Sequence, residues 1–153
     1  MTIKPIVLVS ACLLGFTCRY DGKAQRVEAV QSLANKYRLL PICPERLGGL
    51  TVPRPPAEIR GGRVYNNRDE EVTDYFLRGA KLVGKLAQRY ECKAAVLKAN
   101  SPSCGYGYIY DGTFTGRKIE GNGLTAMHLL KLGLKLVNEN TLAQLEQEES
   151  HTK

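Results

Sequence analysis

Three short apolar runs in this chain each end shortly before a cysteine, and this repeated arrangement limits the folds that the sequence can adopt. The runs span residues 6–9, 39–42 and 94–97, and the cysteines are Cys12, Cys43 and Cys104. Apolar runs of about four to eight residues, bounded by turn signals, are typical of buried strands. Ligands of open α/β sheets bind beyond the carboxyl ends of the strands. The pattern therefore predicts that three thiols, distant in sequence, converge at one edge of a sheet.

The segments between these runs have the spacing of helices. Apolar residues recur as on the buried face of a helix over 27–37, 67–90 and 124–132. Asn67 and Glu70 match a capping box at the start of the second segment. Gly133 is a stop signal after the third, and Asn140 is expected to cap a last helix.

Strands that alternate with helices favour right-handed βαβ units and a parallel sheet. The expected strands are 6–10, 38–42, 93–98 and 134–137. An Asp-Gly pair also predicts a hairpin over 108–116. The Gly/Pro-rich stretch 47–65 is long for a loop in a compact domain, so we expect a functional loop or lid there. The fold class is α/β: a small, mostly parallel, Rossmann-like sheet of about four strands with helices on both faces.

The bulk properties are those of one globular domain with a basic surface. The chain has 153 residues, and its net charge is +7 from 22 Lys and Arg against 15 Asp and Glu. We expect one domain over 1–147, a size that suits a single core, and a frayed tail over 148–153. The positive residues are scattered, without the dense basic run or RNA-binding signature that indicates nucleic-acid binding. RNA is therefore a possible but not favoured partner.

The segment before Cys12 resembles a lipoprotein cleavage site, but its short apolar run fits a buried strand better. Residues 9–12 read Val-Ser-Ala-Cys, yet the apolar part before them is only 6–9, shorter than the roughly 7–15 residues of a signal peptide. No run approaches the ~20 apolar residues of a membrane-spanning helix. We therefore expect a cytoplasmic protein with no membrane partner. In that compartment clustered cysteines indicate metal binding or catalysis rather than structural disulfides.

Three kinds of site use cysteines in this way, and the first two are structural zinc and thiol redox chemistry. Structural zinc favours Cys-x-x-Cys pairs, which the chain lacks, and its two histidines are poorly placed, His128 in mid-helix and His151 in the tail. Thiol redox chemistry needs a reactive cysteine with a resolving partner. Cys12 and Cys18 can form such a pair, so this alternative stays open.

An iron–sulfur cluster is the third kind of site. Its iron is held by cysteine thiolates, and Cys12, Cys43 and Cys104 suit that role because each follows a different strand. Three thiolates on a four-iron cluster leave one iron free for a substrate, by analogy with the open position of catalytic zinc. Cys18 is then a fourth ligand or a nearby loop thiol. Cys92 begins the third strand and is interpreted as a small buried residue.

Polar side chains stand beside these thiols. Glu45 follows the second cysteine by two residues, and Asn100, Ser101 and Ser103 directly precede the last. Glu45 is either a proton-transfer group or a helix cap, because carboxylates also stabilise free N–H groups where a helix starts. The serines are either site residues or turn formers. We expect Ser10, Asn100 and Ser103 to contact a substrate.

Five motifs, in order along the chain, resemble the thiouracil desulfidase (TudS) family, long filed as a domain of unknown function. They are VSACLLG with FTCRYDG, CPERLGGLTVPRPPAEI, LKANSPSCG, IYDGTFTG and EGNGLTA. The resemblance covers nearly the whole chain, from the first strand to the fourth. It implies an iron–sulfur desulfidase that acts on thiolated uracils and binds a [4Fe-4S] cluster through three cysteines. By motif these cysteines are Cys12, Cys43 and Cys104.

The resemblance also implies an acidic residue and a serine at the site, which map to Glu45 and Ser101. The reaction expected from it is non-redox: the sulfur of 2- or 4-thiouracil binds the free iron, and water activated by Glu45 attacks the ring carbon. Uracil and hydrosulfide are the products, as for a hydrolase or lyase. Two alternatives stay open at this stage. One is the same chemistry on thiolated bases in RNA, and the other is a non-catalytic iron–sulfur or metal-binding sensor.

Overall fold

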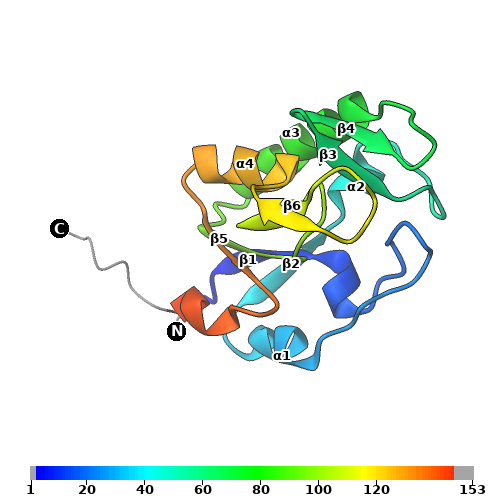
Figure 1. Cartoon of the computed structure of the whole chain (residues 1–153). Helices are drawn as coiled ribbons and strands as arrows, with labels where there is room; N and C mark the ends of the chain where they lie inside the picture. The colour runs from blue at the N-terminus through cyan, green and yellow to red at the C-terminus, as the bar shows by residue number, and fades with distance from the viewer. Residues whose placement is uncertain (1–2, 147–153) are drawn as a thin grey trace.

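A four-stranded parallel sheet lies at the centre of the protein, whose computed structural model describes residues 3–146 (Figure 1). Its strands are β1 (Ile6–Ser10), β2 (Arg38–Ile42), β5 (Ala94–Leu97) and β8 (Lys135–Asn138). They lie in the order β2-β1-β5-β8, and every neighbouring pair is parallel. The predicted α/β fold is confirmed, with β1 and β2 at the predicted bounds and β5 and β8 within one residue of them.

Helices cover both faces of this sheet, as predicted (Figure 1). The α-helices are α1 (Glu28–Gln31), α2 (Pro44–Leu47), α3 (Thr73–Arg89) and α4 (Leu124–Lys131). Short 3₁₀ turns span Ala11–Leu14, Ser32–Asn35 and Leu142–Glu146. α3 and α4 lie on one face, and α1 lies on the other with the last 3₁₀ turn. Within the described residues, no helix is both long enough and apolar enough to cross a bilayer.

The two faces follow from the alternation of side chains along each strand. On β1, Leu8 belongs to a core with Val83 of α3 and Leu129 of α4. Its neighbours Val7 and Val9 point the other way, into a second core that includes Val30 of α1. A strand buried on both faces has a continuous apolar run in its sequence, which is why β1 was recognisable.

The helix predicted over 67–90 begins six residues later than expected. The predicted capping box at Asn67 is wrong, because the neighbouring Asn66 organises a turn there instead. Its Oδ1 accepts hydrogen bonds from the backbone N–H groups of Arg68 and Glu70, both at 3.0 Å, and its Nδ2 donates to the Glu70 carboxylate at 2.7 Å. α3 therefore starts only at Thr73. The helix predicted over 27–37 is shorter than expected, consisting of α1 followed by a 3₁₀ turn.

The Gly/Pro-rich stretch 47–65 is not a plain loop. It contains most of a hairpin formed by β3 (Ala57–Arg60) and β4 (Arg63–Asn66). Gly61 and Gly62 form the turn with φ values of 60° and 80°, as two-residue hairpin turns require. Ile59 and Val64 pack this hairpin against Phe76 of α3.

The hairpin predicted over 108–116 is present but longer. Its strands are β6 (Tyr108–Tyr110) and β7 (Lys118–Glu120), and residues 111–117 form the connecting loop. The helix expected after Asn140 is the 3₁₀ turn Leu142–Glu146. The predicted tail 148–153 and His151 lie outside the described residues.

Candidate functional site

A cavity of about 470 Å³ lies beyond the carboxyl ends of β1, β2 and β5. The chain passes from β1 to β2 on one side and then returns to β5 on the other side of β1. Such a reversal of strand order is where open α/β sheets bind their ligands. The cavity-lining residues include four of the five cysteines, Cys12, Cys18, Cys43 and Cys104. The predicted convergence of strand-end thiols is therefore confirmed.

Each strand-end thiol is placed by the backbone that follows its strand. Cys12 lies in the 3₁₀ turn directly after β1, and its carbonyl accepts a hydrogen bond from Gln25 N at 3.0 Å. Cys43 directly precedes α2. α2 lies against α3 because Gly79 has no side chain: a Cβ there would stand 2.0 Å from the carbonyl oxygen of Pro44.

Cys104 is held by the start of α4. The backbone N–H groups of Leu124 and Thr125 donate to the carbonyls of Pro102 and Ser103, at 2.9 and 3.0 Å. Gly123 permits this approach, because a Cβ at that position would lie 2.5 Å from the Ser103 backbone. The motif around Gly123 thus serves the cysteine loop, although it contributes no group to the cavity lining.

The thiols are packed closely enough to change each other's proton affinity. Burial raises the pKa of Cys104 to about 12, opposed by a hydrogen bond of 3.2 Å from Ser10 Oγ to its sulfur. Hydrogen bonding to the Cys18 thiol, together with burial, raises the pKa of Cys43. A hydrogen bond with Cys12 raises the pKa of Cys18. At Cys18, Cys43 and Cys104 the protein alone thus stabilises neutral thiols, and a metal centre bound by any of them must displace its proton.

The donor set at this cavity fits an iron–sulfur cluster. It consists of soft sulfur ligands, which favour Fe–S clusters, and His128 is not among the lining residues. Among residues 3–146, no three His, Cys, Asp or Glu side chains are grouped to hold a single metal ion. Cys92 packs in the core beside the sheet and does not line the cavity. Four cysteines, Cys12, Cys18, Cys43 and Cys104, therefore supply the sulfur donors at this cavity.

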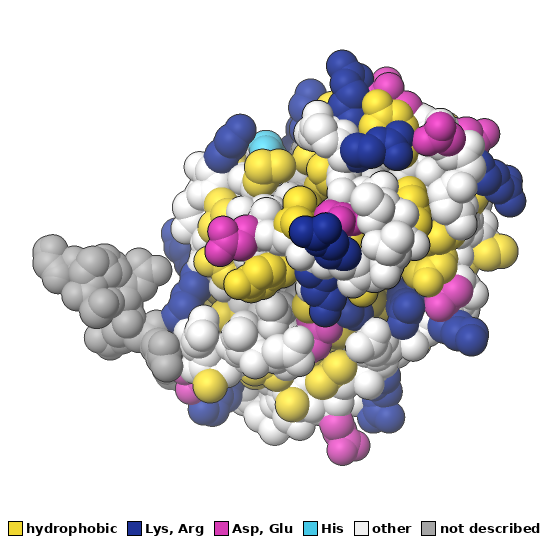
Figure 2. All heavy atoms as spheres, viewed as in Figure 1, with side chains coloured by type: hydrophobic (Ala, Val, Ile, Leu, Met, Phe, Trp, Pro, Cys, Tyr) yellow, Lys and Arg dark blue, Asp and Glu magenta, His cyan; other side chains and the backbone are white. Residues whose placement is uncertain are grey.

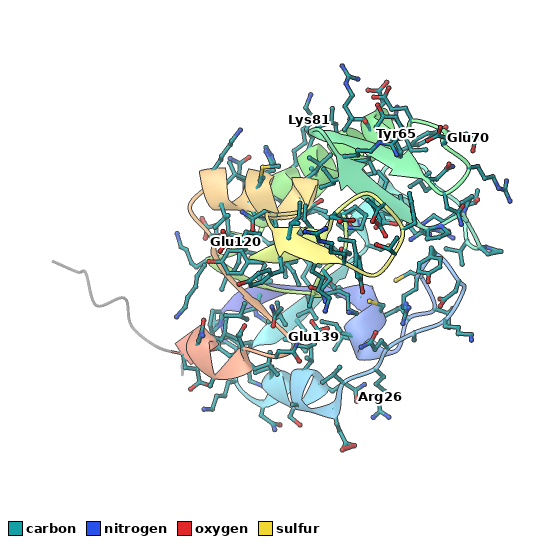
Figure 3. All side chains as sticks on the ribbon, in the orientation of Figure 1. Arg26, Tyr65, Glu70, Lys81, Glu120 and Glu139 are labelled. Atoms are coloured by element: carbon teal, nitrogen blue, oxygen red, sulfur yellow. The ribbon has the colours of Figure 1, made fainter. Side chains whose placement is uncertain are left out.

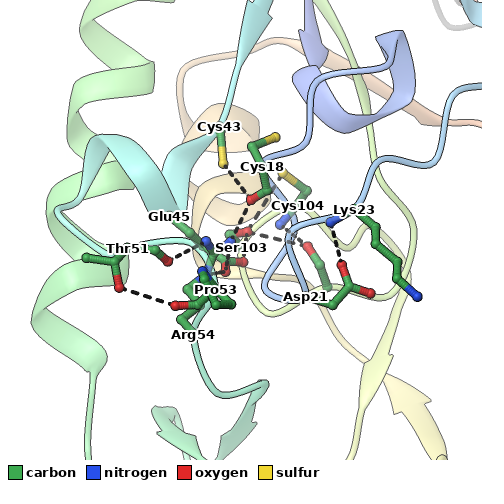
Figure 4. Close-up of polar contacts among 11 residues, drawn as sticks. Cys18, Asp21, Lys23, Cys43, Glu45, Thr51, Pro53, Arg54, Ser103 and Cys104 are labelled. Carbon is green, nitrogen blue, oxygen red and sulfur yellow. Dashed lines mark hydrogen bonds and ion pairs between the residues drawn. The ribbon is translucent and has the colours of Figure 1, made fainter.

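Glu45 lies in the first turn of α2 and is the hub of the polar contacts at the site (Figure 4). Its Oε1 accepts hydrogen bonds from Arg54, with Nη2 at 2.9 Å and Nε at 3.0 Å. Its Oε2 accepts a hydrogen bond from Ser103 Oγ at 2.8 Å. The side chains of Glu45 and Arg54 are only 14% and 6% exposed, so this ion pair is largely shielded from water.

Arg54 is a site residue that the sequence did not single out. Besides Glu45, its guanidinium donates to the carbonyls of Cys18 and Thr51, each at 3.0 Å. It thereby ties the Cys18 loop to α2 and to the Gly/Pro-rich stretch. The available signal was a lone arginine among prolines in the motif TVPRPPAEI.

The serine-rich segment before Cys104 has two roles in the structure. Ser101 Oγ accepts a hydrogen bond from Cys104 N at 2.7 Å, as a turn-forming serine does. It also lies 3.4 Å from Ser103 Oγ, and both serines line the cavity. Asn100 does not line it, and has a left-handed φ of 69° next to the turn. Asn100 as a substrate contact stays a prediction.

Lys98 lines the cavity but is already paired. Its Nζ lies 3.1 Å from Glu139 Oε2, and the other carboxylate oxygen of Glu139 accepts from Ala99 N at 2.9 Å. Glu139 is labelled in Figure 3. On the face shown in Figure 2, Lys and Arg side chains lie at several separate places with Asp and Glu side chains among them. The cations at the cavity are thus balanced by neighbouring carboxylates.

The two hairpins complete the cavity. We call Ser10, Cys12, Cys43 and Cys104 the thiol wall. We call Glu58 of β3, Tyr110 of β6, and Phe114 and Gly116 of the 111–117 loop the hairpin wall. The thiol wall offers sulfur ligands, whereas the hairpin wall offers two aromatic rings and one carboxylate.

Comparisons with known proteins point to one family. The family model described as 2-thiouracil desulfurase matches residues 7–141. The chain is 40% identical over 147 residues to YbbK of Bacillus subtilis (strain 168), a protein described as uncharacterized, covering 90% of this chain and 97% of that protein. Among solved structures it is similar to the [4Fe-4S]-dependent thiouracil desulfidase TudS. The TM-score is 0.88 with 41% identity, over 93% of this chain and 95% of that one.

Proposed function

The chain belongs to the 2-thiouracil desulfurase family, and on that premise we propose that it removes the sulfur of a thiolated uracil with the help of a [4Fe-4S] cluster. Family membership supports the reaction, and the likeness to TudS supports the cofactor. The observation that carries the proposal is the single cavity that holds the strand-end thiols together with the Glu45–Arg54 pair. The net reaction converts C=S to C=O with water and releases hydrosulfide, so no electrons are needed.

In this proposal Cys12, Cys43 and Cys104 hold the cluster, and Cys18 stays a nearby thiol. When bound, the cluster supplies Lewis-acidic iron that polarises the thiocarbonyl group. The sulfur of Cys104 receives a hydrogen bond from Ser10. Such a bond stabilises a thiolate over a thiol, which supports a ligand role for Cys104.

Glu45 is proposed as the general base. Its Oε1 is occupied twice by Arg54, which leaves Oε2 as the atom for proton transfer. Oε2 already accepts one hydrogen bond from Ser103, and a carboxylate oxygen can accept a second, from the attacking water. As the C–O bond forms, one water proton passes to Oε2. The C–S bond then breaks while that proton returns to the departing sulfur and the hydroxyl proton is lost to solvent, which leaves C=O, hydrosulfide and the regenerated carboxylate.

The serines have distinct proposed roles because their hydroxyl protons are used differently. Ser10 donates to Cys104, and Ser103 donates to Glu45. Each of these two hydroxyls can therefore offer a substrate only an acceptor site. Ser101 accepts from a backbone N–H, and its own proton is used only in a long contact of 3.4 Å to Ser103 Oγ, from which it can turn to a substrate. Ser101 is proposed to orient the water or the pyrimidine carbonyl with that proton.

The direct test is anaerobic purification followed by iron and sulfide analysis and an assay for uracil and hydrosulfide. We expect a brown protein with about four irons per chain, as three thiolates on a cubane cluster imply. We also expect uracil release from 2- or 4-thiouracil without added reductant or nucleotide. Stoichiometric zinc in place of iron, or an iron-loaded protein that releases no uracil, would overturn the proposal.

A further inference from the structure

We propose that Phe114 is the residue that packs against the pyrimidine ring of the substrate, and that Glu58 positions it by pinning the 111–117 loop. This inference rests on the proposed function, since it assumes that a thiolated pyrimidine enters the cavity. Phe114 lines the same cavity as the site thiols. The loop that carries it comes from the β6–β7 hairpin rather than from a strand end of the parallel sheet.

The backbone of Phe114 has a conformation that is uncommon for a residue with a side chain. Its φ is 58°, in the left-handed region that bulky residues rarely adopt. Residues held in such conformations occur where the surrounding structure over-determines them, often at ligand sites. Within the described residues, Phe114 belongs to none of the hydrophobic core clusters. A half-buried aromatic residue that lines the cavity with a left-handed backbone is better explained by binding than by packing.

Glu58 is the group that holds this conformation. It is 9% exposed, and its Oε1 accepts hydrogen bonds from Gly112 N at 2.9 Å and Phe114 N at 3.1 Å. Gly112 brings the loop onto β3, because a Cβ there would lie 2.8 Å from the carbonyl oxygen of Ile59. A buried carboxylate is thus committed to two backbone amides of a loop more than fifty residues away.

An aromatic contact suits this substrate because most polar groups around the cavity already have partners. Ser10, Ser103 and Glu45 bond to one another or to the thiol wall. A uracil ring offers two flat faces, and stacking on an aromatic side chain does not depend on which ring carbon bears the sulfur. Phe114 has no hydroxyl, so its contact should serve 2-thiouracil and 4-thiouracil equally.

The test compares Phe114→Ala with Phe114→Tyr in the anaerobically prepared holoenzyme. For Phe114→Ala we expect KM for both thiouracils to rise about tenfold, a typical cost of losing one stacking contact, with kcat within about threefold by the same reasoning. Uracil binding, measured by equilibrium dialysis, should weaken by the same factor. Phe114→Tyr should restore both values. The control is Tyr108→Ala, since Tyr108 is 55% exposed on the same hairpin and does not line the cavity.

Glu58 is tested separately as a positioning residue. Glu58→Ala should speed hydrogen exchange at the amides of Gly112 and Phe114 and raise KM, while the visible absorbance of the cluster stays unchanged. Glu58→Gln should reverse both effects, because its amide oxygen still accepts both bonds. Faster exchange with an unchanged KM would show that Glu58 has only a structural role.

The inference and the proposed function fail in different ways. An iron-loaded wild-type protein that releases no uracil counts against the proposed function. A wild-type protein that turns over thiouracil, with a Phe114→Ala variant of equal KM and equal uracil affinity, counts against the inference alone. Absence of uracil binding to the wild type by dialysis also overturns the inference, whatever the turnover.

Discussion

The thiol wall and the hairpin wall of the cavity are attached to the rest of the protein by different kinds of contact. The thiol wall continues buried strands, and its last cysteine loop is fixed by backbone hydrogen bonds to the start of α4. In the hairpin wall, the 111–117 loop is tied to β3 by hydrogen bonds to one side chain, Glu58. Segments held by few buried contacts open at lower free energy than core strands. In our proposals the thiol wall binds the cofactor and the hairpin wall contacts the substrate, so that recognition falls to the part that can adjust.

The largest expected effect comes from removing one sulfur of the thiol wall. Cys12→Ala, Cys43→Ala or Cys104→Ala should each abolish both the brown colour and uracil release, since a cluster cannot assemble without its thiolates. Iron content and visible absorbance of anaerobically purified protein are the measurements. Cys92→Ala is the matched control and should keep both, because Cys92 packs in the core away from the cavity. Retained colour in all three variants would remove the thiol wall as the cluster site.

The next effect separates the base from the ligands. Glu45→Gln should assemble a normal cluster yet release uracil at least about a hundredfold more slowly, as the loss of a positioned general base predicts. Ser101→Ala is expected to show the same pattern, because it removes the hydroxyl proton but not the loop backbone. Cluster absorbance is read beside single-turnover rates. Loss of the cluster in Glu45→Gln would make Glu45 a structural residue, and a near-normal rate would assign proton transfer to another group.

A smaller effect is expected from Arg54, which ties the Cys18 loop to Glu45 of α2. Arg54→Lys keeps the charge but cannot match the fork that bonds Glu45, Cys18 and Thr51 together. We expect kcat to fall roughly tenfold, as is common when a group that orients a site residue is changed, with the cluster retained. A rise in KM with an unchanged kcat would instead place Arg54 in substrate binding.

The contrast between buried strands and the loops around them also explains which parts of the fold and the site were predictable from sequence. β1 was predicted at its bounds because a strand buried on both faces forms an apolar run that stands out locally. β2 lies at the edge of the sheet with Arg38 and Pro41 exposed, and its apolar residues ending before Cys43 were the signal that found it. The convergence of the thiols then follows from topology, since parallel strands end at one edge. The β3–β4 hairpin was missed although its Gly61-Gly62 turn was a usable signal.

Apolar runs and turn signals do not predict side-chain contacts between residues that lie far apart in the sequence. Glu58 bonds to residues 54 and 56 positions away, and no periodicity encodes that partnership. Arg54 lies only nine positions from Glu45, but α2 and an irregular segment separate them. Asn67 was chosen as a cap where Asn66 forms the turn, because both side chains carry the same chemistry and only the backbone decides between them.

The smallest expected effect tests how closely the hairpin wall must approach β3, using two glycines with similar backbones. Gly112 and Gly133 have φ values of 93° and 89°, so alanine meets about the same left-handed penalty at either site, roughly 1–2 kcal/mol. A Cβ at Gly133 meets open space, whereas one at Gly112 meets Ile59 O at 2.8 Å and Arg60 Cβ at 2.9 Å. Gly112→Ala should therefore cost about 1–3 kcal/mol more than Gly133→Ala in urea unfolding, the usual range for overpacking. Because the displaced loop carries Phe114, only Gly112→Ala should also raise KM for thiouracil. Equal unfolding costs and equal KM values in the two variants would mean that the loop tolerates displacement. The hairpin wall would then not depend on the close approach of Gly112 to β3.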